Sequence, residues 1–383
     1  MVAAAMGPEP RRRRRTWLIA VVALVAAGPA QAQTAELSAD DRQFVDATVM
    51  QAMQSGRLPG VSLKISGPKG NYVKTYGVSN RETSEPMELD DHVRIASITK
   101  TFTATAVLRQ VQRGRLKLSD KLDRWVKGIP YGRQITVRQM LAMRSGIYDF
   151  TTNAAFGRRF GANPLLRWKP ADVVRIIRAN KPTFKPNAKT QYADSNYALL
   201  GIILQKVTGR SAESVITRDV IRPAGLRDTS FPTTPNMPSP FSHGYYAGDD
   251  GDGPVRDYTR SNPKVAWTAG AMISTLDDIE TWGRELATGR LLSRSLQRQR
   301  LKLGTIPNPG GPPVGYGLGI LRFGDWLGHD GAIFGYSSVT FYERSSGAQI
   351  VAAANLSSNF STPTLDIFGT IAERLYPETL RAD

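Results

Sequence analysis

The sequence predicts an α/β fold of the α+β type. An antiparallel sheet formed by both termini is flanked by helices, and a helical subdomain is inserted. Alternating, β-rich segments lie near both ends of the chain, at residues 60–66, 71–78, 316–323, 337–343 and 349–355, whereas the segments between them have helical periodicity. Strands at both ends with helices between them are expected to form one sheet with the helices packed beside it.

Short turns are expected to join these strands. The strands at 60–66 and 71–78 flank the sequence GPKG at 67–70, which predicts a hairpin. The sequence SSG at 345–347 predicts a second turn between the last two strands. A final amphipathic helix is expected at about 364–375.

The middle of the chain is expected to be mostly helical. Residues 98–113 carry apolar residues at helical spacing, and Gly114 follows as a stop signal. Thr136 and Gln139 form the capping-box pattern that begins a short helix. The remaining expected elements are helices at 171–179 and 196–207 and a long surface loop, rich in Pro, Gly, Ser and Asp, at 233–264.

The composition excludes several classes of site. The chain has 383 residues, of which 41% are hydrophobic, as is typical of a globular protein. It contains no cysteine, so disulfides, thiolate catalysis and zinc–cysteine sites are excluded. The three histidines are not at ligand spacing, and neither a P-loop nor G-x-G-x-x-G is present. We therefore expect no metal and no organic cofactor.

The first 32 residues resemble an export signal. Five arginines at 11–15 precede a short apolar stretch at 17–27 and the small-residue triplet at 30–32, the order found in such signals. The alternatives are a basic arm for nucleic acid or a membrane anchor; the apolar stretch is short for a membrane span. We expect an exported, periplasmic or extracellular protein, with residues 33–383 as the functional domain. Either the general or the twin-arginine route would serve.

The net charge of +17 does not by itself indicate a nucleic-acid partner. Without residues 1–32 the chain keeps 45 basic and 32 acidic residues, a net charge of +13. These charges are interpreted as a scattered, solvated basic surface. We expect no nucleic-acid partner and no stable membrane span after removal of the signal; anionic cell-envelope polymers remain possible partners.

The pattern S-x-x-K occurs three times, but only one copy opens a predicted helix. The copies that begin at Ser66 and Ser261 lie in a turn and in a loop. Ser97 and Lys100 stand one helical turn apart, so the hydroxyl and the amine share a face. A helix start also offers free backbone N–H groups for a developing oxyanion. Ser97 is therefore the candidate nucleophile; the alternative is a capping serine with a surface lysine.

Two further segments extend this pattern. They are 189–201 (KTQYADSNYALLG) and 328–336 (GHDGAIFGY). Together with SITK at 97–100 they resemble the serine hydrolases of the class C β-lactamase and D-alanyl-D-alanine carboxypeptidase (penicillin-binding-protein-like) type, a family that includes esterases of the same fold. The resemblance covers about residues 40–375.

The resemblance implies a division of the domain. The β-lactamase/transpeptidase-like fold would place a sheet part at about 40–96 and 310–383 and a helical part at about 97–309. The three family signatures S-x-x-K, Y-x-N and K-T-G or H-x-G appear here at 97–100, 192–194 and 329–331.

The resemblance also implies roles for the catalytic residues. Ser97 would attack a carbonyl carbon and become acylated, and Lys100 would accept or relay its proton. Tyr192 would act as a base or proton shuttle, helped by the positive field of Lys100. His329 would take the place where many relatives have lysine.

Further roles concern substrate contact. Gly331 would let the substrate approach the strand closely. The backbone N–H groups of Ser97 and Ala332 would form the oxyanion hole, and water would then hydrolyse the acyl-enzyme.

Two residues depart from the family pattern. Asp194 replaces asparagine, and a carboxylate there would favour the charged form of Lys100 and weaken it as a base. Asp330 replaces a hydroxyl residue that helps to hold a substrate carboxylate in β-lactamases and carboxypeptidases. Asp330 would repel such a carboxylate, unless it points away or keeps His329 protonated.

The remaining candidates carry less functional signal. His92 is interpreted as structural and His243 as a surface residue. The segment 316–319 (YGLG) is interpreted as part of a strand packed near the site.

The functional prediction is an exported serine hydrolase that acts through an acyl-enzyme on D-alanyl peptides, β-lactams or related amides and esters, with peptidoglycan fragments among the possible substrates. One alternative is a carboxylesterase on the same fold. The other is a penicillin-recognising binding protein that is acylated without turnover. The absence of the G-x-S-x-G pattern argues against an α/β-hydrolase.

Overall fold

The computed structural model describes residues 35–248, 253–358 and 362–381, and the following account concerns these residues. The predicted export signal lies outside them, and so does the predicted first residue of the mature domain. Within the described ranges, no helix has the length and apolar character needed to cross a membrane.

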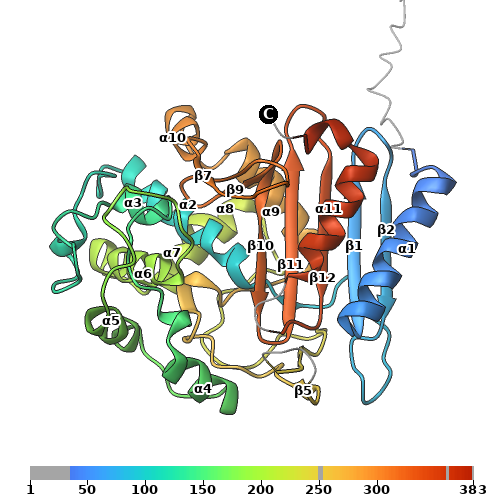
Figure 1. The fold of residues 1–383 in the computed structure, drawn as a ribbon, viewed down its shortest axis with the longest axis horizontal. Coiled ribbons are helices and arrows are strands. Elements are labelled where there is room, and N and C mark those ends of the chain that lie inside the picture. Colours follow the sequence, from blue (N-terminus) through green and yellow to red (C-terminus); the bar gives the residue numbers. More distant parts are fainter. Residues whose placement is uncertain (1–34, 249–252, 359–361, 382–383) are drawn as a thin grey trace, which may run out of the picture. The chain divides into compact units, whose positions relative to one another are not determined.

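An eight-stranded sheet joins segments from both ends of the domain (Figure 1). Its order is β2-β1-β12-β11-β10-β9-β8-β7, and every neighbouring pair is antiparallel. The strands are β1 (Gly60–Ser66), β2 (Tyr72–Gly77), β7 (Gly304–Ile306), β8 (Val314–Tyr316), β9 (Leu321–Phe323), β10 (Trp326–Ile333), β11 (Tyr336–Glu343) and β12 (Gln349–Ala354). The pairing of β1 with β12 confirms the predicted fold class, because it closes the sheet with strands from the two ends.

Helices cover both faces of this sheet (Figure 1). On β11, Phe341 stacks on Phe368 of α11 (Pro363–Leu375), with ring centroids 4.5 Å apart. The neighbouring Thr340 points to the other face, where its hydroxyl donates to the carbonyl of Ile279 in α9 (Leu276–Thr288). This alternation follows from the two-residue period of a strand. The helix α1 (Ala39–Gly56) packs on α11.

The helical part is built around α2 (Thr99–Gln112), which is buried along nearly its whole length. The capping box of Thr136 and Gln139 is present at the start of α3, as predicted. The other helices are α3 (Val137–Leu141), α4 (Ala154–Ala162), α5 (Pro170–Ala179), α6 (Asp194–Thr208), α7 (Ala212–Ile216), α8 (Arg222–Ala224) and α10 (Arg294–Arg300), with a π-helical turn at Thr217–Ile221. Short two-stranded sheets pair β3 (Val93–Arg94) with β6 (Ile273–Ser274) and β4 (Tyr245–Tyr246) with β5 (Arg256–Asp257).

The single strand predicted at 316–323 is wrong. The segment turns back on itself, so that β8 and β9 pair with each other. The amide of Gly317 donates to the carbonyl of Ile320, and Gly319 has a φ of 74°, which suits glycine. A side chain at Gly319 would also collide with Ala104 of α2. The glycines therefore make a turn against α2 rather than extend a strand.

The prediction of a surface loop at 233–264 holds for residues 233–241, which are exposed or partly exposed, but it is wrong for the aromatic part that follows. Tyr245, Tyr246 and Tyr258 are buried, and the Tyr258 hydroxyl donates to the carbonyl of Gly161 at 2.5 Å. The abundance of Pro and Gly correctly indicated irregular backbone. It did not indicate exposure, because the aromatic side chains turn this segment inward.

Candidate active site

Ser97 lies in a short 3₁₀ turn, Ala96–Ile98, immediately before α2. Ala96 has a φ of 46°, a strained conformation for a residue with a side chain. The opposite wall is β10, where a Cβ added to Gly331 would stand 2.9 Å from the Ser97 nitrogen. The turn therefore holds the Ser97 backbone amide close to β10, and only glycine fits at position 331.

Lys100 is fully buried, and its ammonium group meets three acceptors. Its Nζ lies 2.8 Å from Ser97 Oγ, 2.6 Å from Asp194 Oδ1 and 2.6 Å from the carbonyl of Ala269. An ammonium group has three protons, so each acceptor can receive one. The predicted neighbours Ser97, Lys100 and Asp194 are therefore brought together, with Lys100 placed as a donor in the resting site.

Tyr192 lies above this group, with its ring centroid 4.9 Å from Lys100 Nζ. Loss of water around its hydroxyl, and next the charge of Asp194, raise the pKa of Tyr192 well above its usual value. A hydrogen bond with the Ser97 side chain acts in the opposite direction but does not reverse this. The expectation that Lys100 would help Tyr192 to lose its proton is therefore not met. The neutral phenol is the resting form.

His329 is buried, and both of its ring nitrogens are engaged. Nδ1 lies 2.5 Å from the backbone oxygen of Asp330, and Nε2 lies 3.0 Å from the Tyr316 hydroxyl. Burial, and next the charge of Lys100, lower the pKa of His329 to about 3. His329 is thus neutral: Nδ1–H donates to the carbonyl, and Nε2 accepts from Tyr316. The possibility that Asp330 keeps His329 protonated is wrong, because burial dominates.

The third signature follows β10 along the cavity. Asp330, Gly331 and Ala332 all line the cavity. Burial raises the pKa of the Asp330 carboxyl, which is only partly exposed. Seven of the eight predicted site residues therefore line one cavity. The eighth, Lys100, is buried and bonded to two of them, Ser97 and Asp194.

Asp149 is a site residue that the sequence analysis missed. It lines the same cavity and precedes the 3₁₀ turn Phe150–Thr152, whose Thr151 amide donates to its carboxylate. Burial, and next the charge of Asp194, raise the pKa of Asp149 to about 7. No local pattern marks a lone aspartate in a loop. Its proximity to Asp194 arises only in the folded chain.

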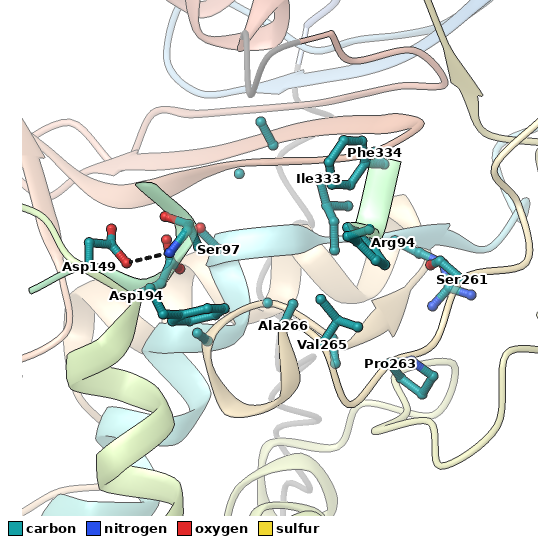
Figure 2. A pocket seen from close by; sticks show the side chains of 18 of the residues that line it. Arg94, Ser97, Asp149, Asp194, Ser261, Pro263, Val265, Ala266, Ile333 and Phe334 are labelled. Atoms are coloured by element: carbon teal, nitrogen blue, oxygen red, sulfur yellow. Dashed lines mark hydrogen bonds between the residues drawn. The ribbon is translucent and has the colours of Figure 1, made fainter. Parts of the chain in front are cut away.

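The cavity has a volume of about 400 Å³ and two different ends (Figure 2). Ser97, Asp149 and Asp194 lie together at one end, and Ser261 and Pro263 lie at the other. The walls between them are largely apolar and include four phenylalanines: Phe150, Phe156, Phe160 and Phe334.

The other candidates lie away from Ser97. His92 Nδ1 lies 2.7 Å from the carbonyl of Pro240, which fits the structural interpretation. His243 is partly exposed, with 28% of its side chain accessible, which fits the surface interpretation, but it also has a partner: its Nδ1 lies 2.7 Å from the Asp257 carboxylate. It links the two ends of the β4–β5 segment, an arrangement that cannot be seen from a lone histidine in a polar sequence.

Comparison with known families assigns this architecture. A model of the β-lactamase family matches residues 45–369. The chain belongs to the β-lactamase family. The match confirms the predicted resemblance and supports the general function of a serine hydrolase of this fold.

Individual members of the β-lactamase family have similar sequences or structures. Protein flp of Staphylococcus aureus (strain N315) is 30% identical over 333 residues, covering 85% of this chain but only 65% of that protein, so this chain spans less than two thirds of that relative. A D-stereospecific amidohydrolase from Streptomyces sp. has a TM-score of 0.75 and 32% identity, covering 87% of this chain and 99% of the other. The D-amino acid amidase of Ochrobactrum anthropi SV3, complexed with D-phenylalanine, has a TM-score of 0.76 and 26% identity, covering 88% and 99%.

Proposed function

We propose that this protein hydrolyses small amides and esters through an acyl-enzyme on Ser97, and that its substrates lack a carboxylate beside the scissile bond. The observation that carries this proposal is the charge around the nucleophile. Asp149, Asp194 and Asp330 line the cavity, and the ammonium of Lys100 is already paired with Asp194. A substrate carboxylate placed here would meet the carboxyl of Asp330 and, above about pH 7, the charged form of Asp149, and no unpaired cation of the described residues lies at this end.

The magnitude of this repulsion is large enough to decide specificity. Two like charges about 4 Å apart cost on the order of 4 kcal/mol at an effective dielectric near 20. That corresponds to roughly a thousand-fold in binding. D-Alanyl peptides and penicillins carry a carboxylate beside the bond that is cleaved. An amino acid amide instead carries a neutral leaving group and an amine, which the carboxyl groups favour.

The resemblance to the two amidohydrolases supports the same substrate class. One of them is a D-amino acid amidase whose structure contains D-phenylalanine. The phenylalanines along the cavity wall could contact an apolar side chain of that size. Amides of apolar amino acids are therefore the first substrates to test, and D-configured ones among them.

A sequence of proton transfers follows from the contacts of Lys100. As Ser97 Oγ bonds to the carbonyl carbon, Lys100 passes one proton to Asp194 and takes the Ser97 proton. The neutral Tyr192 donates its proton to the leaving nitrogen as the C–N bond breaks, and it regains a proton from the Lys100–Asp194 pair. Water then attacks the acyl-enzyme by the same route, which releases the acid and restores Ser97.

The backbone amides of Ser97 and Ala332 would stabilise the oxyanion in both steps. His329, neutral and engaged at both nitrogens, would not exchange protons with the substrate. It would hold β10 in place.

A panel of substrates tests the proposal. D-phenylalanine amide, a neutral nitrophenyl ester, a D-alanyl-D-alanine peptide and nitrocefin would be compared by kcat/KM, and the first two should be hydrolysed fastest. In Asp330→Thr, turnover of nitrocefin relative to the neutral ester should rise. An unchanged or lower ratio would show that Asp330 does not set specificity by repulsion.

Two other outcomes would point to the alternatives. Hydrolysis of esters without amides would identify a carboxylesterase. A stoichiometric burst with penicillin and no steady state would identify a binding protein that does not turn over.

The place of action is a separate proposal. We propose that the protein is exported, on the basis of residues 1–32, and that it meets its substrates in the cell envelope or outside the cell. N-terminal sequencing of the exported protein should find Gln33 first. An uncleaved cytoplasmic product would overturn this proposal and leave the chemistry at Ser97 untouched.

A further inference from the structure

The end of the cavity remote from Ser97 contains a buried cation. Arg94, from β3, lines the cavity and is only 1% exposed. No carboxylate of the described residues lies within ion-pair distance of it; the other fully buried arginine, Arg300, does not line the cavity. Buried charges in proteins are usually paired, because an isolated charge loses its hydration without compensation. Arg94 is therefore a buried cation without a negatively charged partner among the described residues.

Backbone carbonyls occupy only part of the guanidinium. Nη2 donates to the carbonyls of Thr259 at 3.0 Å and Pro235 at 2.9 Å, and Nε lies 3.3 Å from the Thr259 carbonyl. These bonds fasten β3 to the 233–264 segment, which is a structural role. Nη1 makes no hydrogen bond with any described residue, so one edge of the guanidinium is left for another acceptor.

A second donor lies at the same end of the cavity. Ser261 lines the cavity, is 3% exposed, and its hydroxyl makes no hydrogen bond with a described residue. Figure 2 shows Arg94 and Ser261 away from the end that holds Ser97, Asp149 and Asp194. A guanidinium edge and a hydroxyl are donors suited to a carboxylate.

We propose that Arg94 and Ser261 form an anion-binding subsite for a carboxylate at the far end of the substrate's acyl group. The cavity is then divided by charge: its catalytic end rejects a carboxylate, and its remote end binds one. This inference rests on the proposed function for the identity of the bound molecule as a substrate. Burial lowers the pKa of Arg94, as expected for a buried cation that has no carboxylate beside it.

Two esters of equal chain length test the subsite. The mono-4-nitrophenyl ester of adipic acid has a terminal carboxylate, and 4-nitrophenyl hexanoate is its neutral counterpart. The wild-type enzyme should prefer the adipate by about ten-fold or more in kcat/KM, the scale of one charge-assisted hydrogen-bonded contact. A wild-type preference for hexanoate would overturn the subsite without any variant.

Variants assign the preference to its residues. In Arg94→Met the ratio of adipate to hexanoate kcat/KM should fall about ten-fold, whereas Arg94→Lys should keep part of it and Ser261→Ala should lose part of it. Arg260→Met is the matched control, because Arg260 is exposed and next to Ser261; it should leave the ratio unchanged. A purely structural role for Arg94 would lower the rates with both esters alike and leave the ratio unchanged, which would contradict the proposal.

A binding measurement separates this inference from the proposed function. In the Ser97→Ala variant, the mono-4-nitrophenyl ester of adipic acid should raise the unfolding temperature and 4-nitrophenyl hexanoate should not. Adding Arg94→Met to this variant should abolish the stabilisation by the adipate ester. Failure to hydrolyse both esters and D-phenylalanine amide would reject the hydrolase proposal and leave this binding test intact. Hydrolysis of both esters without stabilisation by adipate would reject the subsite alone.

Discussion

At the scale of single residues, the site depends on what each side chain has already bound. Lys100 is hydrogen-bonded to Ser97, Asp194 and a carbonyl, and His329 is bonded at both nitrogens. Neither group has a free lone pair at rest, so Ser97 is activated only when protons move together. Ser97 is half-buried at the cavity wall, whereas Lys100 beneath it is buried completely.

The nucleophile can be identified by covalent labelling. Ser97→Ala should abolish labelling by a fluorophosphonate or a penicillin and reduce turnover by several orders of magnitude, because among the described residues Lys100 donates to no other hydroxyl. Ser66→Ala and Ser261→Ala are the controls for labelling by the fluorophosphonate, since both serines also begin S-x-x-K sequences and neither variant should lose that label. Intact mass spectrometry would decide, and a labelled Ser97→Ala protein would refute the assignment.

The role of Tyr192 can be tested by removing one oxygen atom. Tyr192→Phe keeps the ring against Tyr316 but removes the hydroxyl that interacts with Ser97. Turnover should fall by roughly a hundred-fold or more, the usual scale for a proton-transfer group. Circular dichroism should show an intact fold. Near-normal turnover would mean that the leaving group takes its proton elsewhere.

The raised pKa of Asp149 predicts a pH dependence of stability. The folded protein holds this proton up to about pH 7, whereas an unfolded carboxyl releases it near pH 4. The folded state therefore binds more protons in that window, and its free energy of unfolding falls as pH rises from 4 to 7. The contribution of this group is at most about 4 kcal/mol, since one pKa unit corresponds to about 1.4 kcal/mol.

Asp149→Asn should remove this contribution. The free energy of unfolding of the variant minus that of wild type should be larger at pH 8 than at pH 4.5, as measured by urea unfolding of both proteins at both pH values. The difference between the two proteins isolates Asp149 from other carboxyls, including Asp330, whose pKa is also raised. An equal stability difference at both pH values would contradict the raised pKa.

At the scale of elements, the catalytic geometry is set by the close packing of β10 against the turn that carries Ser97. A Cβ at Gly331 would lie 2.6 Å from the carbonyl oxygen of Ile95 and 2.9 Å from the Ser97 nitrogen. Both neighbours are backbone atoms, which cannot rotate away. The spacing between β10 and the Ser97 turn is therefore fixed by the absence of a side chain.

Gly331→Ala should thus reduce activity far more than it alters the fold. Displacement of the Ser97 amide by even part of an ångström should lower kcat by about a hundred-fold. Gly369→Ala is the control: it lies in α11 with nothing within 4 Å of the added Cβ, and should stabilise the protein by about 0.5–1 kcal/mol. Equal kcat in the two variants would show that the close approach is not needed.

The sequence predicted those elements whose signals are local. The strand at 60–66 and the capping box of α3 follow from alternation and from side-chain spacing, and both are found at the predicted residues. The turn between β8 and β9 was missed because its cause is tertiary: Gly319 packs against Ala104. Asp149 was missed for the same reason, since its neighbour Asp194 is distant in sequence.

At the scale of the whole molecule, charge is distributed less evenly than the sequence analysis assumed. Residues 109–189 contain nineteen lysines and arginines but only four aspartates, a net charge of +15 of the chain's +17. Sixteen of these basic residues are exposed. Composition alone hid this concentration, although the sequence contains it. A strongly basic surface on the helical part thus lies beside a cavity whose catalytic end is acidic.

This distribution predicts opposite salt dependences for substrates of opposite charge. The positive field of the helical part should draw an anionic ester such as the adipate toward the protein and repel the ammonium of D-phenylalanine amide. Salt screens such long-range interactions, with a Debye length of about 30 Å at 0.01 M and about 10 Å at 0.1 M. Between about 10 and 200 mM NaCl, kcat/KM should therefore fall about two- to five-fold for the adipate and rise for the amide.

The neutral hexanoate ester separates this field from other effects of salt, because its kcat/KM should stay nearly constant over the same range. Arg167, Lys181 and Lys185 are exposed and lie outside the cavity lining, so their replacement by glutamate should flatten both dependences without removing a group that touches the substrate. Replacing Arg294, Arg298 and Arg344, which are exposed but lie outside residues 109–189, by glutamate makes the same charge change. It should flatten the salt dependences of kcat/KM less. If both triple variants respond alike, net charge rather than its concentration on the helical part governs the encounter.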